Sequence, residues 1–250
     1  MHATSFKASL VKKEKNGGNA WNFYFTKPDI MQQAGQEDSG IAKKSKKFTY
    51  LPGQYIKINL DIKDPDIRGV SRYFTLSSSP KDQYLMVTTR IIKSTFKESL
   101  GSLVLGQKVQ MRGPWGDFVL DKKETLPLVF IAGGIGITPF RSMLRHLLKE
   151  EHKIPSIKLF VSYKVKRDIL FKKEMDLLTD KKRIQVITVI SSKNKERISI
   201  RSLQEHLVSL DKYSYYISGS EKMVSDMKRM LIHDAKISDR KIKTDDFPGY

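Results

Sequence analysis

The second half of the sequence alternates between apolar segments of strand length and amphipathic segments of helix length. The predicted strands cover residues 128–132, 157–163, 184–190, 215–218 and 241–244, and the predicted helices cover 139–151, 171–178, 200–207 and 221–233. A strand that is followed by a helix pairs in parallel with the next strand, because the helix returns the chain across the sheet. This order therefore predicts an α/β fold with a doubly wound parallel sheet.

The first half has a different pattern, in which short strand-like segments are separated by turn residues. Six strands are predicted at residues 6–11, 21–26, 55–60, 72–77, 84–91 and 109–112, with one helix near 96–104. This number of short strands favours a small antiparallel β-barrel. We therefore predict two domains, a barrel over residues 1–122 and the α/β sheet over 123–250. The polar stretch 27–50 is predicted to be a surface loop.

The chain carries a large positive charge and no cysteine. It has 46 Lys and Arg residues against 27 Asp and Glu residues, so its formal net charge is +19. A field of this sign attracts nucleic acids, acidic membranes, phosphate-bearing cofactors or acidic proteins. The absence of cysteine excludes disulfides and Cys-ligated clusters in this chain, and the five histidines lack metal-ligand spacing. We therefore predict no metal site.

The sequence has no recognisable targeting or membrane signal. Residues 1–15 contain no apolar region of secretory length, and the longest apolar run, 126–140, is interrupted by glycine and proline. That run is shorter than the roughly 20 residues that a membrane-spanning helix needs. We therefore expect a cytoplasmic protein with no transmembrane segment.

Three glycines lie between an apolar strand and the following helix. Gly133, Gly134 and Gly136 allow a ligand to approach the backbone, and the helix N-terminus adds a partial positive charge. Thr138 is predicted to be the helix N-cap and Pro139 the first helical residue. A pyrophosphate suits such a turn, although Pro139 replaces the third glycine of the G-x-G-x-x-G fingerprint. A tight strand–helix turn without a ligand is the alternative.

A second candidate phosphate site lies on the strand predicted at residues 72–77. Arg72 and Phe74 share one face of this strand, and Tyr73 and Thr75 share the other. An arginine can bind a phosphate through two hydrogen bonds, and an aromatic ring two residues away offers a stacking plane. An ordinary amphipathic strand would give the same pattern.

A third candidate is the start of the helix in the first half. Thr95 and Glu98 have the spacing of a capping box, which predicts a helix start. Ser94 and Lys97 would help to bind a phosphate at this helix end. Capping without any ligand is the alternative.

Several segments, taken in order, resemble the motifs of the ferredoxin–NADP reductase superfamily. They are residues 52–55 (P-G-Q), 72–75 (R-x-[YF]-[ST]), 113–118 (G-P-x-G-x-F), 133–139 (G-G-x-G-x-T-P), 217–223 (C-G-P-x-x-M) and 246–250 (E-x-F-x-G-Y). The match covers nearly the whole chain. It implies that the barrel binds a flavin and that the α/β domain binds a nicotinamide nucleotide.

The resemblance also implies roles for individual residues. Thr75 and Ser218 would lie at the point of hydride transfer, near flavin N5 and the nicotinamide. The residues that would bind cofactors are Arg72, Tyr73, Phe74, Thr75, Ser94, Thr95 and Lys97 for the flavin, and Gly133, Gly134, Gly136, Thr138 and Gly219 for the nucleotide. Tyr250 or Phe247 would cover the flavin, unless the tail only closes the edge of the sheet.

Three positions depart from the family motifs. Phe74 stands where tyrosine is usual, Ser218 replaces cysteine, and Ser220 replaces proline. Phe74 keeps a stacking ring but loses a phenolic hydrogen bond. These departures bear on the rate of hydride transfer and leave the reaction type unchanged.

The function implied is that of a flavin-dependent oxidoreductase that passes hydride from NADPH or NADH to FAD. The helix start at 94–97 favours FAD over FMN, and Lys164 and Lys166 favour NADPH. Electrons would pass to an external acceptor, either an acidic protein such as ferredoxin or flavodoxin or a small molecule.

Two other functions compete with this interpretation. One is a basic nucleic-acid-binding barrel, which the net charge favours. Against it, aromatic and cationic side chains do not alternate on one strand face, so we expect no nucleic acid partner. The other is a non-catalytic flavin-binding subunit of a larger redox complex.

Overall fold

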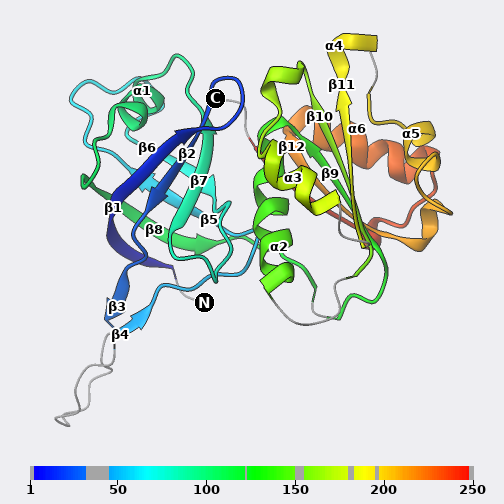
Figure 1. Cartoon of the computed structure of the whole chain (residues 1–250), viewed down its shortest axis with the longest axis horizontal. Coiled ribbons are helices and arrows are strands. Elements are labelled where there is room, and N and C mark those ends of the chain that lie inside the picture. The colour runs from blue at the N-terminus through cyan, green and yellow to red at the C-terminus, as the bar shows by residue number, and fades with distance from the viewer. Residues whose placement is uncertain are drawn as a thin grey trace, which may run out of the picture.

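The amino-terminal domain is an antiparallel six-stranded barrel (Figure 1). The computed structural model of the protein describes residues 3–31, 45–121, 123–149, 155–179, 183–194 and 197–247. The barrel strands are β1 (Thr4–Lys15), β2 (Ala20–Phe25), β5 (Tyr55–Asn59), β6 (Ser71–Thr75), β7 (Leu85–Arg90) and β8 (Lys108–Trp115). Their order is β6-β5-β8-β1-β2-β7, and a bridge between Leu76 and Val87 joins the two ends. The predicted barrel is confirmed.

The barrel closes around alternate apolar side chains of its strands. In β5, Ile56 and Ile58 are buried, whereas the residues on either side of them are partly exposed. The inward side chains of all six strands form one core cluster that also includes Phe96 and Leu100 of helix α1 (Thr95–Ser102). Helix α1 therefore covers one end of the barrel core.

The stretch 27–50 differs from the predicted loop. It contains two short strands, β3 (Asp29–Met31) and β4 (Ser45–Lys47), which pair antiparallel. Residues 32–44 lie outside the described residues. Asp29 and Lys47, register partners on these two strands, are both exposed.

The carboxy-terminal domain is a parallel five-stranded sheet with the order β11-β10-β9-β12-β13. The strands are β9 (Leu128–Gly133), β10 (Ile157–Tyr163), β11 (Ile184–Ile190), β12 (Ser214–Ser220) and β13 (Ile242–Phe247). The helices are α2 (Ile137–Lys149), α3 (Lys172–Thr179), α4 (Ser191–Asn194), α5 (Ile200–Gln204) and α6 (Glu221–Arg229). Short 3-10 turns occur at Gly134–Gly136, Lys166–Asp168, Leu210–Lys212 and Asp239–Lys241, and a π-helical turn at Met230–Asp234. The predicted doubly wound sheet is confirmed.

Both faces of this sheet are covered. Phe130 and Tyr216 on one face pack with side chains of α2 and α3, whereas Ile131 and Ile217 on the other pack with α5 and α6. From β9 the chain builds the sheet outward through β10 to β11, and it then returns to add β12 and β13 on the other side of β9. The strand order therefore reverses between β9 and β12. In such sheets ligands bind beyond the carboxyl ends of the strands at this reversal. No helix within the described ranges is both long and apolar enough to cross a membrane.

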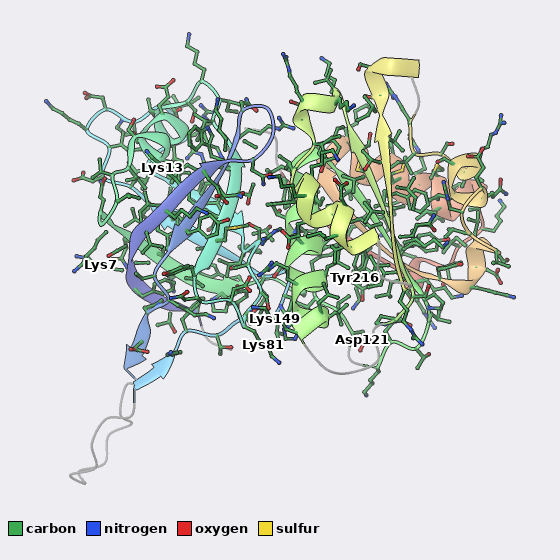
Figure 2. All side chains as sticks on the ribbon, viewed as in Figure 1. Lys7, Lys13, Lys81, Asp121, Lys149 and Tyr216 are labelled. Atoms are coloured by element: carbon green, nitrogen blue, oxygen red, sulfur yellow. The ribbon has the colours of Figure 1, made fainter. Side chains whose placement is uncertain are left out.

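Helix α2 lies between the two domains and bonds to the barrel (Figure 1). Arg141 Nη1 donates to the Ser77 carbonyl at 2.6 Å, and Ser142 Oγ donates to the Ser78 carbonyl at 2.6 Å. At the end of α2, Lys149 lies beside Lys81 of the barrel, as Figure 2 shows. These contacts fix the helix that follows the glycine turn against the barrel.

Asp82 of the barrel completes this contact. Its carboxylate accepts two hydrogen bonds from Arg145 at 2.9 Å and one from Lys149 at 2.6 Å. Burial alone would raise the pKa of Asp82, but the hydrogen bonds from Arg145 and Lys149 outweigh it and hold that pKa well below its ordinary value.

Replacing Asp82 by asparagine should destabilise the protein by about 2 kcal/mol at pH 7, because Arg145 and Lys149 lose a partly buried counter-charge. The depressed pKa means that the stabilisation is present above about pH 4 and is lost as the pH falls further. Urea unfolding of wild type and Asp82→Asn at pH 7 and pH 3 measures both effects. Asp176→Asn, in the exposed pair with Lys172, is the control and should cost less than about 0.5 kcal/mol. Equal losses in the two variants would contradict the prediction.

Candidate active site

A buried cluster of cations lies at the start of α1 in the barrel domain. Ser94 caps the helix, because its side chain accepts the Lys97 backbone N–H at 3.2 Å. Lys97 and Arg72 lie beside this helix end, and Arg72 is only 4% exposed. Burial first, and then the charges of the neighbouring Arg72 and Arg68, lower the pKa of Lys97 to about 7. Arg72 also pairs with Asp66 at 3.4 Å. Cations gathered at a helix N-terminus in this way fit a phosphate.

The capping prediction for this helix is wrong in one detail. Ser94 is the N-cap, so Thr95 is the first helical residue and does not form the predicted box with Glu98. The Thr95 hydroxyl instead accepts the backbone N–H of Asp66 at 3.0 Å. Thr95 therefore ties the helix start to the loop that precedes β6.

The cation cluster is backed by aromatic rings. Lys97 Nζ lies 4.6 Å from the centre of the Phe74 ring, and the Arg72 guanidinium lies 5.1 Å from the centre of the Phe96 ring. Arg72 is oriented by the carbonyls of Arg68 and Ser71, to which it donates at 2.6 Å. The structure thus brings the second and third candidate sites together, with Lys97 beside Phe74 and Arg72.

Tyr73 lies apart from this group, on the outer face of the barrel, and is 55% exposed. Its ring centre is 5.6 Å from that of Tyr55 and 6.0 Å from that of Trp115. Lys57 and Arg112 each lie 5.8 Å from one of these rings. We call this set of five residues the aromatic face. It gathers aromatic and cationic side chains across β5, β6 and β8, which inspection of single strands did not detect.

The glycine turn of the second domain packs tightly on β12. A Cβ atom at Gly136 would lie 2.2 Å from the Ser218 carbonyl oxygen and 2.7 Å from the Gly219 nitrogen. Gly133 and Gly219 lie beside each other on β9 and β12, and Met223 Sδ covers both. Part of the glycine pattern therefore serves packing, while Gly134, at φ +52°, faces a side chain of the barrel.

The N-cap prediction at the start of α2 is wrong. The 3-10 turn Gly134–Gly136 runs directly into α2, which begins at Ile137. The Thr138 hydroxyl donates back to the Ile135 carbonyl at 3.0 Å instead of accepting a backbone N–H. Pro139 lies in the first turn, where its missing N–H removes no helical bond.

Arg90 of β7 is the barrel side chain that reaches the glycine turn. Its Nη2 lies 3.7 Å from the position of a Cβ on Gly134, and its Nη1 lies 3.6 Å from Asp168 Oδ1 in the loop after β10. Nη1 also donates to Asn19 Oδ1 at 3.0 Å. Arg90 was missed in the sequence, because only the fold brings the end of β7 next to the end of β9.

Ser218 lies on β12 next to the turn Gly134–Gly136. It is fully buried, and its Oγ has no hydrogen-bond partner among the described residues. Ser218 and Asp245 are register partners on β12 and β13, so their side chains point to the same side of the sheet. A buried hydroxyl without a partner fits a ligand that supplies one.

Asp245 lies near side chains of the barrel domain, and no motif of the sequence marks it. Burial, and then the charges of Asp246 and Asp117, raise the pKa of Asp245 to about 7. Burial first, and then the charges of neighbours that include Asp245, raise the pKa of Tyr55, the register partner of Thr75. Thr75 and Ser218 are thus the register partners of Tyr55 and Asp245, two side chains close enough to interact electrostatically.

Replacing Asp245 by asparagine should change how stability depends on pH. Between the ordinary pKa near 4 and the raised pKa near 7, folded Asp245 keeps a proton that the unfolded chain releases. Wild type therefore loses stability as the pH rises through this window, and Asp245→Asn should lose less. Urea unfolding at pH 5 and pH 8 tests this, with the exposed Asp176→Asn as control. Parallel pH profiles for wild type and Asp245→Asn would contradict it.

Comparisons with known proteins agree with this architecture. Residues 130–229 match the family model described as an oxidoreductase NAD-binding domain. The chain aligns with a solved FAD/NAD-binding domain of nitric oxide dioxygenase from Vibrio cholerae at TM-score 0.79 and 15% identity, over 97% of this chain and 98% of that one. It aligns with ferredoxin-NADP+ reductase from Plasmodium falciparum at TM-score 0.75 and 17% identity, over 97% and 96%. This chain has the ferredoxin–NADP reductase fold. The family resemblance of the sequence motifs is confirmed.

A curated relative of this ferredoxin–NADP reductase-like chain is longer than the chain itself. Flavohemoprotein A of Dictyostelium discoideum is 26% identical over 234 residues, which cover 88% of this chain and 55% of the relative. The chain thus spans about half the length of this relative. The predicted domain boundary at 122/123 falls in the connection between β8 and β9. Tyr250, the predicted flavin cover, lies outside the described residues.

Proposed function

We propose that this ferredoxin–NADP reductase-like chain is a flavin-dependent oxidoreductase that transfers hydride from NADPH or NADH to FAD and passes the electrons to an external acceptor. The observation that carries the proposal is the pairing of two anion sites, one in each domain. The anion site of the barrel consists of the cations at the start of α1, and that of the α/β domain is the glycine turn. Helix α2, which follows that turn, is bonded to the barrel.

The residues at the start of α1 fit the phosphates of FAD. Arg72 and Lys97 would bind the pyrophosphate together with the Ser94 cap, and Phe74 would pack against the flavin. Bound FAD would supply hydride acceptance and the onward release of single electrons. FAD suits this site better than FMN, because the helix start offers a position for a second phosphate.

The glycine turn and its neighbours would hold the nicotinamide nucleotide. The backbone of Gly134 would approach the pyrophosphate, and Arg90 would supply a cation from the barrel domain. Ser218 would offer its unpartnered hydroxyl to the nicotinamide, and Thr75 would bond near the flavin edge. Asp245, which holds a proton near neutral pH, would be the nearest acid to this position. The loop cations Lys164 and Lys166 support a preference for NADPH.

The aromatic face supports an acidic protein as the acceptor. Tyr73 lies on the outer face of the barrel beside Tyr55, the register partner of Thr75, which would bond near the flavin edge. Tyrosine, tryptophan and arginine are the side chains that contribute most to protein interfaces. Lys57 and Arg112 add positive charge that would attract an acidic partner such as ferredoxin or flavodoxin. A small oxidant is the other acceptor that the sequence indicates.

An absorption spectrum of the purified protein, followed by anaerobic titration with NADPH and NADH, tests the proposed function. We expect a yellow protein whose absorption in the blue disappears on addition of coenzyme. A protein that binds no FAD would overturn the proposal, and one that binds FAD without bleaching would be a non-catalytic flavin subunit. The aromatic face is also the observation that favours nucleic acid binding. Salt-dependent binding of labelled RNA by a colourless protein would support that function instead.

A further inference from the structure

We infer that the first hairpin of the barrel positions the coenzyme loop of the other domain, with Asn16 as the positioning residue. The hairpin turn is 16–19, between β1 and β2, and the loop is 164–171, between β10 and α3. Figure 1 shows the blue turn of β1 and β2 reaching the α/β domain, where Asn16 and Phe171 are hydrogen-bonded. The inference rests on the proposed function, because it concerns the affinity for NADPH or NADH.

The contact is made to the backbone at the end of the loop. The Phe171 backbone N–H donates to Asn16 Oδ1 at 2.7 Å. Phe171 has φ +53°, a conformation that non-glycine residues with large side chains rarely adopt and that the surrounding structure must therefore hold. The Arg141 guanidinium lies 4.7 Å from the centre of the Phe171 ring. Asn16 and Arg141 thus hold this residue from two sides.

Asn16 is itself held by the barrel. Its Nδ2 donates to Asn22 Oδ1 at 2.9 Å, and the same oxygen accepts the Thr88 hydroxyl at 2.8 Å. Asn22 and Thr88 are buried, on β2 and β7. Because Asn16 Nδ2 donates to Asn22, the side-chain oxygen Oδ1 of Asn16 is the atom that faces the loop. The position of Phe171 is therefore fixed by strands of the barrel.

The hairpin also fits closely against the loop backbone. A Cβ atom at Gly17, which has φ +75°, would lie 2.3 Å from the Ile169 carbonyl oxygen. Next to it, Arg90 joins the turn, through Asn19, to Asp168 of the loop. A displacement of the turn would displace the loop in the same direction.

The loop lies where the adenosine part of a dinucleotide binds. It follows the carboxyl end of β10, and β10 is the neighbour of β9, which carries the glycine turn. In sheets of this topology the second strand ends at the ribose of the adenosine. The loop contributes Lys164, Lys166 and Arg167, whose positions set the fit of that ribose and of any phosphate on it. The flavin domain thereby tunes coenzyme affinity from outside the nucleotide domain.

The test compares Asn16→Ala with Ser142→Ala in the full chain loaded with FAD. Both variants lose one hydrogen bond between the domains, but only Asn16 contacts the coenzyme loop. We expect Asn16→Ala to raise the dissociation constant of NADP+, measured by calorimetry, and the KM for NADPH, with ferricyanide as acceptor, about tenfold. The kcat and the FAD content should not change. Ser142→Ala should leave both NADP+ affinity and KM at the wild-type values.

Gly17→Ala provides a second test of the inference. Its new methyl group would displace the loop by steric contact, whereas Asn16→Ala would remove the hydrogen bond that holds the loop. Gly17→Ala should also raise the dissociation constant of NADP+ without loss of FAD, and it decides the matter if Asn16→Ala does not fold. Unchanged NADP+ affinity in the folded variants would overturn the inference, as would an equal loss in Ser142→Ala. A wild-type protein that binds no NADP+ and no NAD+ would overturn the proposed function instead.

Discussion

Replacing Lys97 by methionine is expected to weaken FAD binding about a hundredfold, equivalent to about 2.7 kcal/mol. The substitution keeps the length of the side chain and the contact with Phe74 but removes the buried charge. A charge-assisted hydrogen bond to phosphate contributes about 1.5–3 kcal/mol, and water does not reach this site freely to replace it. Titration of the deflavinated protein with FAD, followed by flavin fluorescence, measures the loss.

The same substitution should stabilise the protein when FAD is absent. Burial and the charges of Arg72 and Arg68 lower the pKa of Lys97 to about 7, so the charged form is held against an unfavourable environment. Methionine has no charge to bury, and the melting temperature of the deflavinated variant should rise above that of wild type at pH 6. Weaker FAD binding together with a higher melting temperature would show that Lys97 binds a phosphate. Loss of a purely structural lysine would instead lower both the FAD affinity and the melting temperature.

The pH dependence of FAD binding gives a further readout of Lys97. Bound phosphate would raise the pKa of this lysine above 7, so binding takes up a proton at higher pH. FAD affinity of wild type should therefore fall as the pH rises above about 7, and Lys97→Met should lack this decrease. Lys93→Met, an exposed lysine just before the helix, is the matched control and should behave as wild type. Equal FAD affinity in wild type and Lys97→Met would refute the role of Lys97.

Strands with strong local signals could be predicted from the sequence. The mainly apolar segments 157–163 and 184–190 form β10 and β11 with the predicted bounds. Both are rich in β-branched or aromatic residues, which favour strands. β10 is mostly buried in the interior of the sheet, whereas β11 forms its partly exposed edge. Alternation also predicts that Arg72 and Phe74 share one face of their strand. That Lys97 lies beside them was implied only by the family resemblance, because it depends on how α1 packs on the barrel.

Features that depend on contacts between distant segments could not be predicted. The aromatic face combines residues of three strands, and Arg90 meets the glycine turn only because the two domains pack together. Asp245 is one of two adjacent aspartates in the sequence, and only the register with Ser218 distinguishes it. The N-cap role assigned to Thr138 failed for a related reason. The 3-10 turn before α2 is set by the packing of Gly136 on β12, which local sequence does not encode.

Replacing Gly136 by alanine is therefore expected to have the largest effect in the α/β domain. The new methyl group would lie 2.2 Å from the Ser218 carbonyl oxygen and 2.5 Å from its carbon, both backbone atoms that cannot rotate away. Either the turn or the end of β12 must move, which should cost about 3 kcal/mol of stability and displace Ser218 and the backbone around Gly134 together.

Loss of coenzyme binding should accompany this destabilisation. NADP+ calorimetry on Gly136→Ala should detect no binding at concentrations that saturate wild type, while FAD, bound by the other domain, is retained. Gly101→Ala is the control, because its methyl group would meet Ile91 only at an ordinary 3.7 Å and alanine favours the helix that Gly101 occupies. That variant should bind both cofactors and be as stable as wild type or more so. Normal NADP+ affinity in Gly136→Ala would show that the glycine turn and β12 do not form the coenzyme site, because no nucleotide could bind there unaffected by the displacement.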